Sequence, residues 1–216
     1  MKNKEDVMKA LFVIMNIEQH FSSPLRLHKT DGQSLSHITL FMSKLYLLQG
    51  LSGVGKTHLG KYAATKLAAV FIDQDSYYKK VKPEVTLSDG TIVKNWDCVA
   101  ALDWEKMENE VMGLLQKSDV VLAGFALRDD HLGKLSTYVP QRRIELVYGD
   151  QELSRCKAAR KKAKNINEDR DALVIQELVI PFYMETKARG RFDKLVRVYE
   201  GEERKSVEKL YKEGFS

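Results

Sequence analysis

A chain of 216 residues with 44% hydrophobic and 30% charged residues has the composition of an ordinary globular protein, and it is long enough to bury a full core. No apolar stretch approaches the ~20 residues of a membrane span. Two cysteines, Cys98 and Cys156, are too few for a disulfide framework, which indicates a reducing, cytoplasmic setting. The net charge of +5 suits an anionic substrate such as a nucleotide but does not demand nucleic acid.

Residues 1–41 do not belong obviously to the unit that follows them. An apolar-rich run from Val7 to Ile17 predicts a short helix, and its apolar core is short for a signal peptide. Glu5 and Asp6 argue against a mitochondrial transit peptide, which avoids acidic residues. We therefore expect an N-terminal extension over 1–41 and a domain over 42–216. The alternative for the extension is an added helix that packs on the domain.

The strongest motif of the chain reads Gly50-Leu51-Ser52-Gly53-Val54-Gly55-Lys56-Thr57. It fits G-x-x-x-x-G-K-[ST], the phosphate-binding loop of P-loop NTPases, and it stands between a strand-like run, 45–48, and a run with helical spacing, 56–67. Its glycines let several backbone N–H groups point at phosphate oxygens, and the N-terminus of the helix adds its partial positive charge. A chance glycine turn before a helix is the alternative.

The motif predicts that this loop binds ATP and Mg²⁺. Lys56 would reach the β- and γ-phosphates, and the Thr57 hydroxyl would ligate the metal. The residues expected to bind the nucleotide are Gly50, Ser52, Gly53, Val54, Gly55, Lys56, Thr57 and His58.

A second predicted strand, 70–72, ends in Asp73-Gln74-Asp75. A carboxylate at the C-terminal end of a strand lies beside the ligand crevice in an open α/β sheet, so this segment is expected near the nucleotide. The residues that follow, 80–95, are predicted to be a loop with a turn at Asp89-Gly90.

The rest of the chain alternates between helices and strands. In order we predict a helix over 100–117, strands at 120–122 and 143–147, a basic helix over 150–164, a helix over 170–187 that Pro181 should kink or break, a strand over 194–199 and a closing helix over 206–212. Together with the P-loop, this alternation predicts an α/β P-loop NTPase fold, a doubly wound and mostly parallel sheet flanked by helices.

Three further segments resemble the uridine kinase and nicotinamide riboside kinase family of P-loop kinases. They are Gln74-Asp75-Ser76-Tyr77-Tyr78, which resembles that family's Q-D-S-F-Y segment, Asn95-Trp96-Asp97 with Ala101-Leu102-Asp103, which resembles its N-[FW]-D…A-[FIL]-D segment, and Leu153-Ser154-Arg155 with Arg160, which resembles its arginine-bearing lid. With the P-loop, the resemblance spans residues 43 to about 200, so the domain over 42–216 would be a P-loop kinase domain.

The resemblance implies ATP-dependent phosphoryl transfer to a hydroxyl of a nucleoside-like small molecule, of the uridine, cytidine or nicotinamide riboside class. Asp75 would be the base that faces the acceptor hydroxyl, a role that agrees with the chemistry of phosphoryl transfer. Asp97 would accept hydrogen bonds from ribose hydroxyls, and Tyr78 or Trp96 would flank the acceptor ring. Each has a plainer alternative, because Asp75 and Asp97 are also good helix caps and aromatic side chains are often core.

The resemblance also implies catalytic roles for Arg155 and Arg160, which would close over the γ-phosphate and stabilise its charge. Some lysines of the basic helix over 150–164 are expected to face solvent, whether or not the arginines act on phosphate. One departure concerns the metal, since the family places an acid just after the third strand and this chain has Leu122-Ala123-Gly124. Asp73 is the candidate to replace that acid as a metal ligand, through a water if needed.

Two other functions remain open at this stage. A 5′-hydroxyl polynucleotide kinase also has a P-loop, an aspartate after the second strand and an arginine lid, and the basic helix over 150–164 would suit it. The Asn95-Trp96-Asp97 segment favours a small acceptor, which makes nucleic acid the less expected partner. A non-catalytic nucleotide-binding module is the third possibility, because Ala123 lacks the acid, but Asp75 argues against it.

Overall fold

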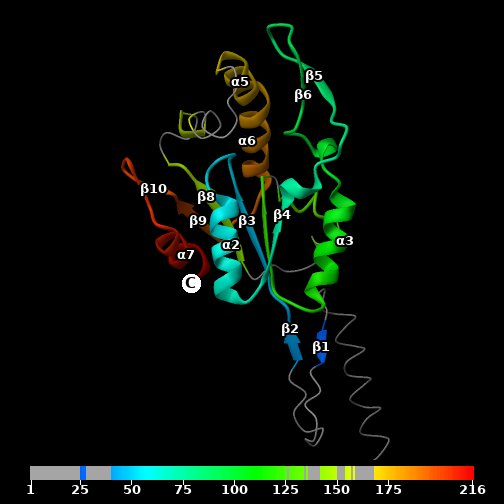
Figure 1. Ribbon diagram of the computed structural model, residues 1–216, viewed down its shortest axis with the longest axis vertical. Coiled ribbons are helices and arrows are strands. Elements are labelled where there is room, and N and C mark those ends of the chain that lie inside the picture. The colour runs from blue at the N-terminus through cyan, green and yellow to red at the C-terminus, as the bar shows by residue number, and fades with distance from the viewer. Residues whose placement is uncertain are drawn as a thin grey trace, which may run out of the picture.

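The computed structural model describes residues 25–27, 40–125, 127–133, 135, 142–149, 154–156, 158 and 168–216. They build a central sheet between two layers of helices (Figure 1). In spatial order the strands of this sheet are β4 (Val70–Asp73), β7 (Val120–Gly124), β3 (Leu45–Gly50), β8 (Arg142–Val147) and β9 (Lys194–Arg197). Every neighbouring pair is parallel, which confirms the predicted doubly wound α/β fold.

Strand β3 lies at the centre of the sheet, and both of its faces are covered. Tyr46 and Leu48 pack in the same core as residues of helices α2 (Lys56–Leu67) and α7 (Val207–Phe215). Leu45 and Leu47 alternate with them and pack on the other face against helix α3, Trp104–Leu115. A run that is apolar at every position is what a strand buried on both faces requires.

Helix α6 (Ile180–Arg189) joins α3 on that second face, where the Tyr183 hydroxyl donates to Glu145 Oε1 of β8 at 2.6 Å. The predicted helix over 100–117 is shorter than expected. It begins at Trp104 because Asp103 caps it, accepting from the N–H of Lys106 at 3.1 Å.

The predicted loop over 80–95 is wrong in part. The expected turn at Asp89-Gly90 is present, but the segments beside it pair as an antiparallel hairpin, β5 (Glu84–Thr86) and β6 (Ile92–Lys94). Strands of three residues are too short to show an alternating pattern, and only the structure shows that Val93 of β6 is buried and lies opposite Val85 of β5.

Pro181 disturbs its helix without breaking it. Helix α5 (Glu168–Val174) passes through a π-helix, Ile175–Val179, into α6, and Pro181 lies in the first turn of α6. The N–H of Ile180 bonds to the oxygen of Ile175, five residues earlier. A proline has no N–H and crowds the carbonyl four residues before it, and this wider turn accommodates both effects.

Some predictions fall outside the described residues. The helix expected at Val7 to Ile17 lies there, as does most of the basic helix over 150–164. Within the extension, the structure describes a short strand, β1 (Leu25–Leu27), that pairs antiparallel with β2 (Leu40–Met42) just before the central sheet (Figure 1). The division of the chain at residue 42 stays a prediction.

Candidate active site

The P-loop lies where β3 ends and α2 begins. Gly53 and Gly55 have φ angles of 78° and 107°, which L side chains rarely adopt. A Cβ atom on Gly55 would also lie 2.4 Å from Nη2 of Arg204, so a side chain there would displace that guanidinium group. No side chain caps the N-terminus of α2, which leaves its first N–H groups available to an anion.

A cavity of about 410 Å³ opens beside this loop. The cavity is lined by residues from several separate segments of the chain, which are Ser52, Gly53, Gly55, Lys56, Thr57, His58, Asp73, Asp75, Tyr78, Trp96, Asp97, Phe125 and Val174. The structure therefore brings most of the predicted nucleotide and acceptor residues into one space. Sequence analysis missed Phe125 and Val174. Phe125 directly follows β7, and its place at the carboxyl end of a buried strand was a usable signal.

Lys56 is half-buried, and its Nζ donates to the carbonyl oxygen of Leu51 at 3.0 Å. Burial lowers the pKa of this ammonium group, and the carboxylates of Asp75, Asp73 and Asp97 act against that shift. A lysine that feels three carboxylates across a small cavity is close enough to them for charge compensation. It is also placed to bridge to an anion that enters between them.

Asp73 and Thr57 form the candidate metal site. The Thr57 hydroxyl donates to Asp73 Oδ2 at 2.8 Å, so two hard oxygen atoms of β4 and α2 meet at the cavity. Ligands of octahedral Mg²⁺ at about 2.1 Å are about 2.9–3.0 Å from one another, which this pair fits. Asp73 also lies beside Ala123 in the parallel register, so a carboxylate on the neighbouring strand is level with the missing acid.

Within the described residues, no group of three or more His, Cys, Asp or Glu side chains is arranged to hold a metal ion. Mg²⁺ does not need such a cage, because it commonly takes one or two protein ligands and completes its shell with phosphates and waters. The donor set therefore fits Mg²⁺ better than a transition metal.

Neither Asp75 nor Asp97 is the N-cap residue of a helix in the described part of the chain. Asp73, not Asp75, caps the 3₁₀ helix Gln74–Tyr77, accepting from the N–H of Asp75 at 3.2 Å. After Asp97 the short helix Val99–Ala101 begins at Cys98, and Asp103 caps α3. Both carboxylates instead line the cavity, with the N–H of Asp97 held by Asn95 Oδ1 at 3.0 Å.

Tyr78 and Trp96 form an aromatic corner of the cavity. Their ring centroids are 5.1 Å apart at an interplanar angle of 74°, an edge-on contact. Trp96 is 46% exposed, so it is not plain core, and the ammonium group of Lys82 lies 3.7 Å from its ring centroid. Both rings therefore border the cavity, and Lys82 occupies one face of the Trp96 ring.

The hairpin β5–β6 connects the two halves of this corner and reaches across to the helices above the sheet (Figure 1). At its tip, the N–H of Ser88 donates to Glu177 Oε2 at 3.0 Å, and the Ser88 hydroxyl donates to the other carboxylate oxygen. Glu177 is three residues from Val174, which lines the cavity. The hairpin is thus tied to the helical segment that contributes Val174 to the cavity.

Arg155 does not line the cavity in this structure. Its guanidinium group donates to the carbonyl oxygens of Tyr148 at 2.9 Å and Gly201 at 2.8 Å, and it lies 3.9 Å from the ring centroid of Tyr199. Arg160, its predicted partner, lies outside the described residues. The lid roles of both arginines stay predictions.

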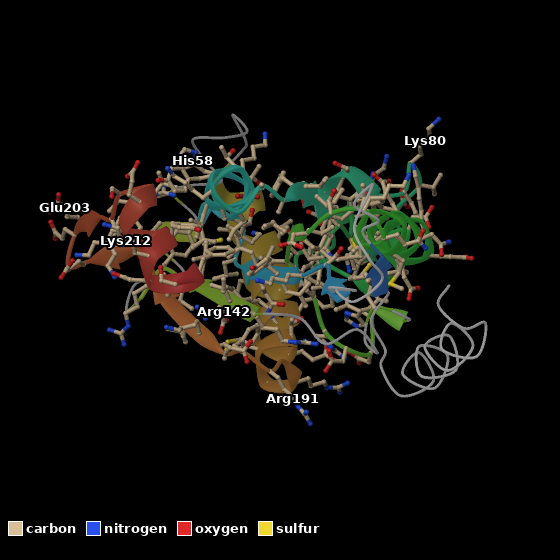
Figure 2. All side chains as sticks on the ribbon, turned by 90° about the horizontal axis from the view of Figure 1, so that it is seen from below. His58, Lys80, Arg142, Arg191, Glu203 and Lys212 are labelled. Atoms are coloured by element: carbon tan, nitrogen blue, oxygen red, sulfur yellow. The ribbon has the colours of Figure 1, made fainter. Side chains whose placement is uncertain are left out.

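A second cavity, of about 390 Å³, adjoins the P-loop on its other side. It lies between the start of α2 and the C-terminal segment, and its lining includes His58, Arg204 and Lys205. His58 lines both cavities, and Figure 2 shows it between Glu203 of the C-terminal segment and Lys80, which projects from the opposite flank.

Among the described helices, none is long and apolar enough to cross a membrane.

No protein-family model matches the sequence, and no curated protein matches it. Solved structures do. A gluconokinase from Sinorhizobium meliloti 1021 is 16% identical, with 80% of this chain and 89% of that chain covered and a TM-score of 0.49. A shikimate kinase from Bacteroides thetaiotaomicron is 20% identical, with 78% and 94% covered and a TM-score of 0.44. At such identities and scores, what this protein does has to be argued from its own residues.

Proposed function

We propose that the protein is an ATP-dependent kinase that phosphorylates a hydroxyl group of a nucleoside-like small molecule. The observation that carries this proposal is the shared cavity, where the P-loop residues Lys56 and Thr57 face the carboxylates that follow β4 and β6. A phosphate site and an acceptor site that share one space are what in-line phosphoryl transfer requires.

Each part of the cavity has a role in this reaction. The backbone of the P-loop and Lys56 hold the β- and γ-phosphates. Asp75 accepts the proton of the acceptor hydroxyl as the hydroxyl oxygen attacks the γ-phosphorus, and the bond from that phosphorus to the β–γ bridging oxygen breaks to release ADP. Asp97 accepts hydrogen bonds from hydroxyls of the acceptor, and the ring of Trp96 or Tyr78 packs against a planar group. Thr57 and Asp73 would hold Mg²⁺, which neutralises charge on the phosphates.

The proposal is tested with γ-labelled ATP and a panel of acceptors, which are uridine, cytidine, nicotinamide riboside, gluconate, shikimate and a 5′-hydroxyl oligonucleotide. We expect transfer to a nucleoside-type acceptor that depends on Mg²⁺. Transfer to a sugar acid alone would keep the kinase and reject the nucleoside class. Nucleotide binding without transfer to any acceptor of the panel would favour a non-catalytic module.

A 5′-hydroxyl polynucleotide kinase is the second candidate, and one observation favours it. Three lysines, Lys79, Lys80 and Lys82, follow Tyr78 in the chain, and Lys82 lies over the exposed ring of Trp96, which lines the cavity. Lysines beside a stacking ring suit a single-stranded polyanion.

Salt separates the two candidates at saturating ATP. Affinity for single strands falls with a log–log slope of about −0.7 for each phosphate contact, so three contacts predict about a 20-fold loss when salt rises fourfold. A neutral nucleoside has no phosphate to lose, and its KM should stay nearly flat. Efficient phosphorylation of the oligonucleotide, with a KM that climbs steeply with salt, would replace the small-molecule proposal.

A further inference from the structure

The carbonyl groups of the P-loop are held from outside by distant parts of the chain. The Tyr148 hydroxyl, 96 residues further along, donates to the oxygen of Ser52 at 2.8 Å. The buried thiol of Cys156 approaches the same oxygen at 3.6 Å. Arg204 Nη2 donates to the oxygen of Val54 at 3.2 Å. Tyr148 follows β8, and Arg204 ends the hairpin of β10 (Tyr199–Glu200) and β11 (Glu203–Arg204).

These contacts have a geometric consequence. The structure has no cis peptide bonds among the described residues, and in a trans peptide the C=O and N–H of one unit point in opposite directions. A donor that holds the oxygen of Ser52 outside therefore turns the N–H of Gly53 away from itself. Arg204 holds the oxygen of Val54, and it therefore turns the N–H of Gly55, in the same peptide unit, away from itself. Both glycines line the cavity that contains Lys56 and Thr57, and Gly55 also lines the second cavity, which Arg204 borders.

We propose that Tyr148 and Arg204 are positioning residues of the phosphate site, which aim the N–H groups of Gly53 and Gly55 at bound phosphate. This inference rests on the proposed nucleotide site but assigns it residues outside the P-loop motif. Both glycines have positive φ angles, which leaves their peptide units more freedom to rotate than ordinary residues have. External anchors reduce that freedom before the anion arrives, and such preorganisation improves anion binding.

Of the two anchors, Tyr148 allows the more specific substitution. Its side chain is 2% exposed, and its hydroxyl is the part that reaches the loop. Tyr148→Phe removes the hydroxyl and keeps the ring in the core. Tyr211→Phe is the matched control, because its ring packs on Tyr62 and Phe215 where α2 meets α7.

Calorimetric titration with inorganic tripolyphosphate and, separately, with adenosine tests the proposal. We expect Tyr148→Phe to weaken tripolyphosphate binding by about 2- to 10-fold, the range for one hydrogen bond, while adenosine binding stays unchanged and Tm falls by only about 2–4 °C. Tyr211→Phe should bind both ligands like the wild type. Equal tripolyphosphate affinity in Tyr148→Phe and wild type would overturn the role of Tyr148, and so would an equal loss for adenosine.

Arg204 gives an independent arm, because it is exposed and its replacement leaves the core intact. Arg204→Met should weaken tripolyphosphate binding with little effect on adenosine, and Arg204→Lys should restore part of it, since an ammonium group can also donate to the oxygen of Val54. A loss for adenosine as large as that for tripolyphosphate would instead show a contact with the nucleoside part of the donor and overturn the positioning role.

Amide NMR of the ligand-free protein separates failure of this inference from failure of the nucleotide site. Tyr148→Phe should shift or broaden the N–H signal of Gly53 and leave Gly90, in the turn of the β5–β6 hairpin, unchanged. If the wild type bound no tripolyphosphate, the nucleotide site would be wrong, yet an altered Gly53 signal would still support the anchor. An unaltered Gly53 signal would overturn the anchor even if the wild type bound tripolyphosphate well.

Discussion

Lys56 carries the positive charge of the proposed phosphate site, and Lys56→Ala should abolish measurable phosphoryl transfer. The side chain lines a cavity rather than the core, so we expect the Tm to change little. Lys61→Ala, on the exposed side of the same helix, is the control and should keep full activity. Wild-type turnover by a folded Lys56→Ala protein would reject the nucleotide assignment.

Asp75 is the proposed general base, so its replacement should slow the chemical step, whereas Lys56 supplies charge to the phosphate site. Asp75→Asn should lower kcat by about 10²–10⁴, the usual range for loss of a general base, while the Kd for ATP changes little. Rapid-quench measurement of a single turnover isolates that step from product release. A kcat equal to that of the wild type would leave Asp75 as no more than a residue of the 3₁₀ turn.

Asp97 should affect binding of the acceptor instead of the chemical step. Asp97→Ala removes an acceptor of hydrogen bonds at the far wall of the cavity, so we expect the acceptor KM to rise by about 10-fold with a smaller change in kcat. Steady-state kinetics at saturating ATP measure both quantities. The ribose-binding role fails if the acceptor KM is unaltered for every active substrate.

At the scale of elements, the tip of the β5–β6 hairpin is tied to the π-helix Ile175–Val179. Glu177 accepts two hydrogen bonds from Ser88, and their loss in Glu177→Ala should free the hairpin tip. Because the hairpin lies between Tyr78 and Trp96 in the chain, we expect the acceptor KM to rise about fivefold while the ATP KM stays constant. Gln176→Ala, exposed on the same π-helix, is the control. Parallel rises in both KM values would mean that the hairpin does not act on the acceptor side.

For the whole molecule, acid stability depends on an ion-pair network that joins the segment after β7 to α6. Arg128 is buried, and its guanidinium group contacts Asp130 and, at 3.1 Å, Glu185. The hydrogen bond from Arg128 lowers the pKa of Asp130 from 3.8 to about 2. A depressed carboxylate pKa stabilises the fold at pH values above about 4, and that contribution is lost as pH falls towards 2.

Asp130→Asn should therefore lose free energy of unfolding less steeply than the wild type between pH 4 and pH 2. Half of the Asp130 side chain is exposed, so solvent screening limits the difference to about 1 kcal/mol. Urea unfolding at several pH values measures it, with Glu202→Gln as a control that changes one surface charge. Identical pH dependence in Asp130→Asn and wild type would show that this pair does not contribute.

Much of the phosphate half of the site was predictable because its signals are local. A P-loop needs glycines, a lysine and a hydroxyl at fixed spacing between a strand and a helix, and all of these features lie within about 25 consecutive residues. The parallel sheet followed from alternating strands and helices for the same reason. Asp73 and Asp75 could be placed near the ligand because the carboxyl ends of parallel strands share one edge.

The tertiary structure alone decided which distant groups meet. The spacing of residues along the sequence does not predict that Thr57 bonds to Asp73 or that Ser88 bonds to Glu177. It also does not predict that the Tyr148 hydroxyl donates to the oxygen of Ser52. Each of these contacts depends on strand order and on helix packing, which bring residues 16 to 96 positions apart within hydrogen-bond distance. The hairpin β5–β6 belongs to the same class, since its three-residue strands are too short to show a pattern and its tip bonds to Glu177, 89 residues away from Ser88.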